Sequence, residues 1–250
     1  MKLADLAHDL DEFLRVKDVR DSDLALNGLQ VECGRDIATV AVAVDACQVV
    51  IDEAVARRAD LLIVHHGLFW DGLQPLTGRP FRRLSTLVRN DLALYSAHLP
   101  LDVHPEVGNN AVLSRRLGIA VAGWWGEYQG AAIGTWGELD TGREELVARL
   151  GKVLGNAPRL LACGPTRTKR VGIVTGAGGS MIAEAKAFGL DTFITGEAKH
   201  HAYFDAEELG ANVILAGHYA TETVGVRALG EHLAGRHGLA WFFIDHPTGL

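Results

Sequence analysis

The alternation of apolar and polar positions divides the chain into short strand-like runs and longer helix-like segments. Residues 37–44 (IATVAVAV) and 61–64 (LLIV) are continuous apolar runs, which are typical of buried strands. Residues 1–14 and 47–58 repeat apolar side chains at helical spacing. This alternation predicts an α/β protein with mostly parallel sheets flanked by helices. The other predicted helices are 81–90, 110–117, 144–154, 180–188, 201–209 and 223–233, and the other predicted strands are 92–97, 171–175, 191–195, 212–216 and 240–244.

Two stretches of the chain resemble one another. Residues 40–66 and 171–197 align without a gap, and each reads as strand, helix and strand. The simpler explanation is that all β-α-β units look alike, and it stays open at this point. We predict two lobes of like topology, residues 1–125 and 126–250, with the C-terminal segment allowed to return to the first lobe.

Composition and charge favour a globular protein and disfavour a disordered or nucleic-acid-binding one. The 250 residues are 48% hydrophobic and 22% charged, which is typical of a globular protein and not of a disordered one. The formal net charge of −7 disfavours a dedicated nucleic-acid binder. The three cysteines lie far apart without a CxxC motif, so the sequence favours neither disulfides nor a thiolate zinc site. With no signal peptide and no membrane span in the pattern, we expect a cytoplasmic location and no membrane partner.

Metal-binding side chains follow the predicted strands. Histidines stand at three strand ends, and a carboxylate lies four residues beyond two of them. Ligands of parallel α/β sheets bind at the carboxyl ends of the strands. A single histidine there is more often a structural residue, but two side chains four residues apart share a helix face and can chelate one ion. The predicted metal ligands are His65, His66, His98, Asp102, His218 and Glu222.

The number and type of these ligands indicate the kind of metal site. Four imidazoles and two carboxylates are too many for one tetrahedral zinc ion with an open position. They suit two divalent ions about 3.5–4 Å apart, bridged by a carboxylate and a water molecule. Zn, Fe, Mn and Ni all accept imidazole and carboxylate ligands. Because such ions lower the pKa of bound water, the site predicts hydrolytic chemistry.

Five motifs occur in the order that one known family shows. They are NGLQV (27–31), HHGLFW (65–70), HLPLDVHPEVGNN (98–110), TGE (195–197) and GHYATE (217–222). With these motifs the sequence resembles the short form of the GTP cyclohydrolase I type 2 homologs, also called the Nif-three-like family. The family often has His-Thr-x-Leu-Asp where this chain has Pro100 between His98 and Asp102.

The resemblance carries expectations about assembly and site. It implies a two-lobed α/β subunit with a dinuclear metal site between the lobes, a toroidal homohexamer, and a small-molecule substrate that can be a nucleotide. It also implies metal ligands at matching positions of this chain, with His98 close by as a further ligand. Those positions are His65, His66, Asp102, His218 and Glu222.

Two further residues are candidates for catalysis. His104 could donate a proton or contact a substrate phosphate, and capping of its loop explains it equally well. Glu197, at the end of a predicted strand, could orient a ligand or act as general base, with a buried hydrogen-bonding role as the alternative. Asp45 also ends a predicted strand, and there we favour the structural role.

These expectations combine into a predicted function. We expect a metal-dependent hydrolase of a nucleotide-like or phosphorylated small molecule, and the family name would make the reaction a GTP ring opening. The alternative is a metal-binding or metal-handling scaffold without catalysis. An open coordination position facing a cavity would favour the enzyme, and a closed site would favour the scaffold.

Overall fold

The chain forms two compact units. The computed structural model describes residues 1–22, 25–70, 72 and 74–249. The first unit comprises residues 1–107 and 225–246, and the second comprises residues 108–224 and 247–250. The C-terminal part of the chain therefore returns to the first unit. The boundary expected at residue 125 lies inside a strand of the second unit, β5 (Ala120–Tyr128).

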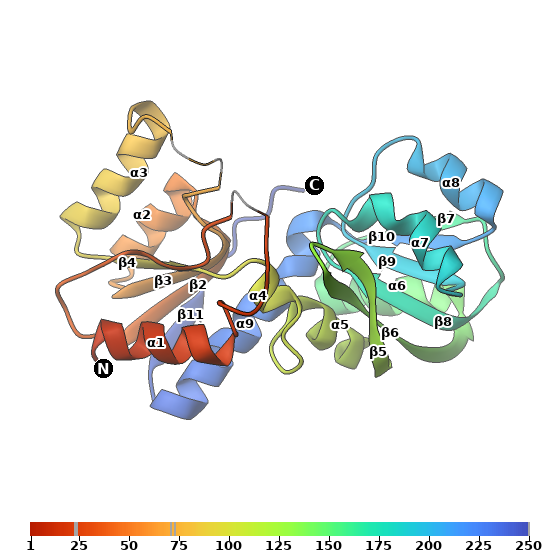
Figure 1. Ribbon diagram of the computed structural model, residues 1–250, viewed down its shortest axis with the longest axis horizontal. Coiled ribbons are helices and arrows are strands. Elements are labelled where there is room, and N and C mark those ends of the chain that lie inside the picture. The colour runs from red at the N-terminus through yellow and green to blue at the C-terminus, as the bar shows by residue number, and fades with distance from the viewer. Residues whose placement is uncertain (23–24, 71, 73, 250) are drawn as a thin grey trace. The chain divides into compact units, whose positions relative to one another are not determined.

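The first unit is built on a five-stranded sheet with the strand order β1-β4-β3-β2-β11 (Figure 1). Only the edge strand β1 is antiparallel to its neighbour, and the other pairings are parallel. The carboxyl ends of β2, β3 and β4 therefore meet at one edge, where Asp45 pairs with His66. The strands are β1 (Gly28–Val31), β2 (Thr39–Asp45), β3 (Leu61–His66), β4 (Ala93–Ser96) and β11 (Ala240–Phe243).

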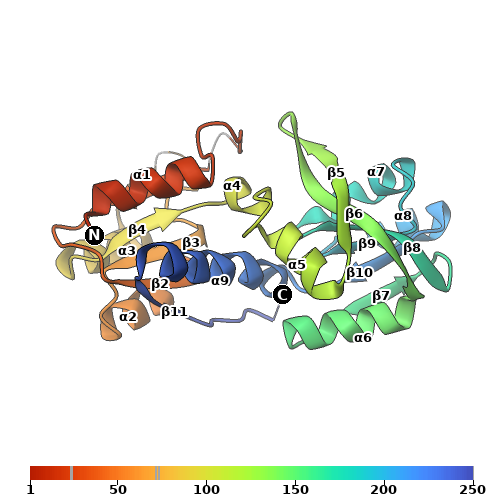
Figure 2. The same cartoon turned by 90° about the horizontal axis from the view of Figure 1, so that it is seen from below.

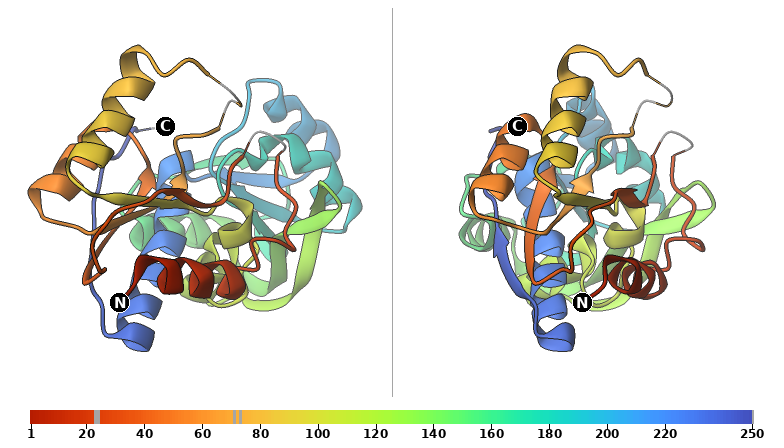
Figure 3. Two further views of the ribbon diagram at one scale, coloured as in Figure 1. Left: turned by 60° about the vertical axis from the view of Figure 1, so that its left-hand side comes forward. Right: turned by 90° about the vertical axis from the view of Figure 1, so that its left-hand side faces the viewer.

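Helices cover both faces of this sheet. Helices α1 (Leu3–Phe13) and α9 (His218–His237) cover one face, and α2 (Gln48–Ala56) and α3 (Gly78–Arg89) cover the other (Figures 2 and 3). Successive side chains of a strand point to opposite faces. Val42 and Ile63 accordingly pack with Leu6 of α1, whereas Ala41 and Leu62 pack with Ile51 of α2. Only the part of α9 from Gly225 onward belongs to the first unit.

The second unit is built on a six-stranded sheet with the order β5-β6-β8-β9-β10-β7. Strands β8, β9 and β10 are parallel, and β5, β6 and β7 pair antiparallel with their neighbours. Helices α5 (Asn109–Leu117) and α6 (Arg143–Leu154) cover one face, and α7 (Ile182–Ala187) and α8 (Ala202–Leu209) cover the other. The further strands are β6 (Ala131–Gly142), β7 (Arg159–Ala162), β8 (Arg167–Val174), β9 (Thr192–Thr195) and β10 (Asn212–Leu215). No helix among the described residues is long and apolar enough to cross a membrane.

The predicted α/β class with two similar units is confirmed. The repeated segments form β2-α2-β3 and β8-α7-β9, and corresponding pairs stand in the same register, Val42 opposite Ile63 and Ile173 opposite Ile194. The second sheet, however, is mixed and not mostly parallel. The hairpin of β5 and β6 was not predicted, because β5 shows no regular alternation of buried and exposed residues.

The packing of the first sheet predicts the effect of a cavity. Ile63 is 0% exposed in the centre of β3, so Ile63→Ala should lower the free energy of unfolding by about 2–5 kcal/mol. Val88 on α3 is 61% exposed, and Val88→Ala should cost less than about 0.5 kcal/mol. Urea unfolding followed by circular dichroism measures both losses. Equal losses would contradict the buried position of Ile63.

Candidate metal site

Three histidines of the first unit gather at the carboxyl edge of its sheet. His65 and His66 are the last residues of β3, and His98 follows β4 as the N-cap of the short helix α4 (Leu99–Asp102). The ring centroid of His65 lies 4.7 Å from that of His66 and 4.9 Å from that of His98. One ligand atom from each residue lies within 4.8 Å of the others, so this group could hold a metal ion.

An oxygen acceptor holds each of the two β3 rings through Nδ1. Nδ1 of His65 lies 2.9 Å from the carbonyl oxygen of Ala97, and Nδ1 of His66 lies 2.9 Å from Oδ1 of Asp45. A neutral ring that donates from Nδ1 carries its lone pair on Nε2, which is the form that binds a metal. Asp45, for which the sequence favoured a structural role, therefore acts on a predicted ligand.

Asp21 holds the third ring. Its carboxylate accepts Nδ1–H of His98 at 3.0 Å, the side-chain amide of Asn27 at 2.9 Å and the backbone N–H of Leu99 at 3.1 Å. Burial alone would raise the pKa of the Asp21 carboxyl, but these hydrogen bonds and the His98 charge outweigh it and hold the pKa below its usual value. The ionised carboxylate is therefore available as an acceptor for His98.

Asp21 was not predicted from the sequence. It lies in a loop before β1, at no strand end and at no helical spacing from another ligand. Its one possible signal is its position shortly before the NGLQV motif, which begins with Asn27. The side-chain oxygen of Asn27 accepts the backbone N–H of His98 at 2.7 Å, so this motif residue also positions the ligand loop.

The residues that follow His66 explain the rest of the HHGLFW motif. A Cβ atom at Gly67 would collide with the side chain of Gln30, whose Oε1 accepts the N–H of Leu68 at 2.8 Å. Trp70 packs edge-on against His98 with 4.6 Å between ring centroids. The motif therefore lets the chain pass close to Gln30 after β3 and places an aromatic ring beside His98.

Asp102 also lies at this group. Its Oδ2 atom is 3.6 Å from Nε2 of His65, and its side chain is only 10% exposed. Pro100 occupies the first turn of α4, where its fixed φ suits a helix and no N–H is needed. The departure from the family motif at this position is thus compatible with the helix that carries Asp102.

The second unit contributes two further predicted ligands. His218 and Glu222 lie in the first turns of α9, with Nε2 of His218 3.1 Å from Oε1 of Glu222. Nδ1 of His218 lies 3.0 Å from Oε1 of Glu197, which follows β9. Glu222 is buried, whereas the side chain of Glu197 is 49% exposed. This contact is compatible with an orienting role for Glu197, and its orienting and general-base roles both stay predictions.

A glycine permits the close packing around this pair. Gly176, after β8, has φ +67°, and a Cβ atom there would collide with the Glu222 carboxylate and lie 3.3 Å from Nε2 of His218. Its N–H donates to Oγ1 of Thr221 at 3.1 Å, and its carbonyl accepts the N–H of Glu197 at 3.0 Å. The backbone at Gly176 thus packs directly against the ligand pair.

His104 lies in a different environment. Its Nε2–H donates to the carbonyl oxygen of Phe13 at 3.0 Å, and its Nδ1 accepts the backbone N–H groups of Glu106 and Val107 at 3.2 Å each. Its ring packs on Phe13 with 4.3 Å between centroids, and burial lowers its pKa. These contacts are those of a residue that caps the loop after α4. The catalytic role of His104 stays a prediction.

Comparison with known proteins identifies the family. Residues 1–248 match Duf34/NIF3 (NGG1p interacting factor 3). The chain belongs to this family. A Halobacterium salinarum protein named GTP cyclohydrolase 1 type 2 homolog is 45% identical over 256 residues, covering 100% of both chains. The resemblance inferred from the sequence motifs is therefore confirmed.

Solved structures agree with this membership. TTHA1606 from Thermus thermophilus superimposes with a TM-score of 0.92 at 42% identity, covering 100% of both chains. The protein ybgI, described as of unknown function, superimposes with a TM-score of 0.93 at 41% identity, also over 100% of both chains. These relatives share the fold of the Duf34/NIF3 chain over its whole length.

The bond between His66 and Asp45 predicts how metal affinity depends on a residue that is not a predicted ligand. Asp45→Asn should weaken Co²⁺ binding by about 10–100-fold, because the ring loses the carboxylate that orients it. Asp52→Asn, at an exposed position of α2, is the matched control and should leave the affinity unchanged. Titration followed by the visible absorption of bound Co²⁺ measures both. The same affinity in the two variants would argue against the orienting role.

The contacts of His218 predict a pH dependence of the metal-free protein. The hydrogen bond to Glu222 is the largest cause that raises the pKa of His218 from 6.5 to about 9, against the opposing effect of burial. Because the folded pKa is the higher one, the proton stabilises the folded state fully below about pH 6.5, and this stabilisation is lost as the pH rises through 9. In Glu222→Gln the pKa of His218 should fall toward 6.5 in an NMR titration.

The control for this titration is Glu208→Gln, at an exposed position of α8. It should leave the His218 resonance titrating near pH 9. A His218 pKa that is the same in Glu222→Gln and in the wild type would show that Glu222 does not hold the proton.

Proposed function

We propose that this Duf34/NIF3 protein is a metal-dependent hydrolase of a nucleotide-like or phosphorylated small molecule. The name of its relatives makes GTP ring opening the first reaction to test. The observation that carries the proposal is the group of three histidines at one sheet edge, which could hold a metal ion. Hydrogen bonds through Nδ1 orient all three rings, as is usual for histidines that bind metals.

The donor set fits divalent transition metals. Imidazole nitrogens and carboxylate oxygens are ligands that Zn, Fe, Mn and Ni accept. Six ligands exceed what one tetrahedral ion takes, and this supports a dinuclear centre with two divalent ions per subunit. When bound, such ions supply Lewis acidity and lower the pKa of water, which is the chemistry of metallohydrolases. The residues proposed to hold them are His65, His66, His98, Asp102, His218 and Glu222.

The other residues of the site orient ligands and move protons. Asp45 and Asp21 fix the rings of His66 and His98. Glu197 fixes the His218 ring, and its half-exposed carboxylate can exchange protons with a substrate. We assign to Glu197 the role of general base. A toroidal homohexamer in the cytoplasm completes the proposal and rests on the family resemblance.

GTP turnover by purified, metal-loaded protein tests this function. The wild type should consume GTP and give a ring-opened product on chromatography, and His66→Ala should lose bound metal and turnover together. His8→Ala, at an exposed position of α1, is the matched control and should keep both. Full activity in metal-free protein would refute the metal-dependent mechanism. Stable metal binding without turnover of GTP or other phosphorylated compounds would instead support the metal-handling alternative.

A further inference from the structure

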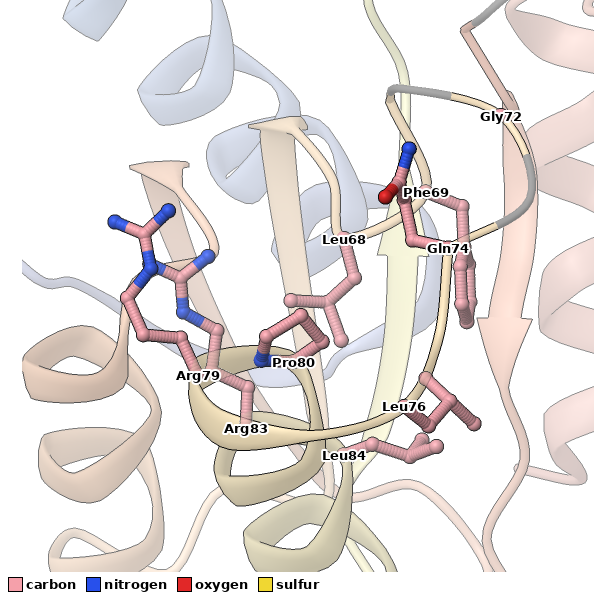
Figure 4. Close-up of a pocket in the computed structure, with 9 residues that line it drawn as sticks. All are labelled: Leu68, Phe69, Gly72, Gln74, Leu76, Arg79, Pro80, Arg83 and Leu84. Carbon is pink, nitrogen blue, oxygen red and sulfur yellow. The ribbon is translucent and has the colours of Figure 1, made fainter.

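The first unit contains a second candidate binding site. It is a pocket lined by residues that follow His65 and His66 in the sequence. It encloses about 140 Å³ between the loop that follows β3 and the first turns of α3 (Figure 4). Leu68 and Phe69 supply the wall on the β3 side, and Leu68 is only two residues beyond His66. Arg79 and Arg83 of α3 supply positive charge.

Two arginines lie on the same face of α3. Arg79 and Arg83 are four residues apart, and this spacing places both side chains on one helix face. In Figure 4 their side chains extend in the same direction along one side of the pocket. Pro80 between them suits the first turn of a helix, because no N–H is needed there. The helical spacing thus places two guanidinium groups beside the pocket.

The charge of this pair is not neutralised by the described part of the protein. Neither the Arg79 nor the Arg83 guanidinium forms a hydrogen bond or ion pair with another described residue. Helix α3 contains no acidic residue, and its N-terminal N–H groups add positive potential. Arg57, Arg149 and Arg236 behave differently, since each pairs with a carboxylate. The chain is acidic overall, so an unpaired cluster of positive charge on α3 stands out from it.

Most of the remaining lining is apolar, and Gln74 adds one polar side chain to it. Leu68, Phe69, Pro80 and Leu84 contribute hydrocarbon or aromatic surface to its wall. An apolar cavity of about 150 Å³ is large enough for one benzene ring. The pocket therefore suits a ligand that combines a small ring or short apolar group with an anion.

We propose that this pocket binds the phosphate-bearing end of a small organic molecule. Two guanidinium groups match a phosphate dianion in charge, and each can offer paired N–H donors to its oxygens. The identification of this molecule as the hydrolase substrate rests on the proposed function, whereas phosphate binding does not. Since the loop that lines the pocket continues directly from His66, a molecule bound there is held beside a predicted ligand strand.

Calorimetric titration with phenyl phosphate tests the binding. The full chain should bind it both when loaded with zinc and after EDTA treatment, and the neutral analogue benzyl alcohol should bind at least about tenfold more weakly. In Arg79→Ala/Arg83→Ala the affinity for phenyl phosphate should fall at least about tenfold. Arg82→Ala/Arg89→Ala removes the same charge from α3 outside the pocket and should change the affinity less than about twofold.

Three results would overturn the proposal. Equal losses in the two double variants would show unspecific attraction to a basic helix. Binding that needs zinc would place phenyl phosphate on the metal. Undetectable binding to the wild type would remove the site. Because Arg79 is exposed and Arg83 only half-buried, both variants should fold normally, which circular dichroism checks.

A kinetic measurement separates this proposal from the proposed function. If a phosphorylated substrate is hydrolysed, Arg79→Ala/Arg83→Ala should raise its KM about tenfold or more without loss of bound metal. An unchanged KM would refute the pocket as a substrate subsite. If no substrate is hydrolysed, the hydrolase proposal fails while the phenyl phosphate titration still decides on the pocket.

Discussion

The hydrogen bonds from histidine Nδ1 atoms to oxygen acceptors determine what the proposed site can do. An imidazole ring at the end of a strand can rotate and change tautomer, and a metal ligand must do neither. In the first unit Asp45 holds His66 and Asp21 holds His98. In the second unit Glu197 holds His218. Most of these residues lie at or just after the ends of parallel strands, whereas Asp21 lies in the loop before β1. The acceptors supply the orientation of the rings.

The two units contain similar β-α-β segments in which the positions of the histidine and of the carboxylate that contacts it differ. His66 and Glu197 occupy corresponding positions of the repeated segments, each at or just after the end of the second strand. In the first unit this position carries a predicted ligand, and the carboxylate of Asp45 on the neighbouring strand orients it. In the second unit it carries the orienting carboxylate, and the histidine lies on α9. The two β-α-β segments thus share their strand register but carry different residues at their ends.

Local sequence patterns predicted most of the fold and suggested the metal ligands, because both depend on short-range spacing. Apolar runs such as residues 61–64 locate buried strands, and the spacing of His218 and Glu222 locates a shared helix face. The β5–β6 hairpin was not predicted, because buried and exposed residues do not alternate along β5. Asp21 was not predicted, because its partner His98 lies 77 residues further along the sequence. No local pattern encodes a contact over that sequence separation. Finding Asp21 therefore needed the structure, whereas Asp45 and Glu197 follow strand ends that the sequence already singled out. The metal ligands themselves stay predictions.

X-ray absorption spectroscopy of the zinc-loaded protein tests the central claim most directly, because it reports the atoms that bind the metal. The account predicts a shell of nitrogen and oxygen atoms at about 2.0–2.2 Å with the multiple scattering of several imidazole rings. That imidazole signal should weaken in a variant that lacks His65 and His66. A shell of sulfur at about 2.3 Å, or an oxygen shell without imidazole scattering, would contradict a metal site built on oriented histidines.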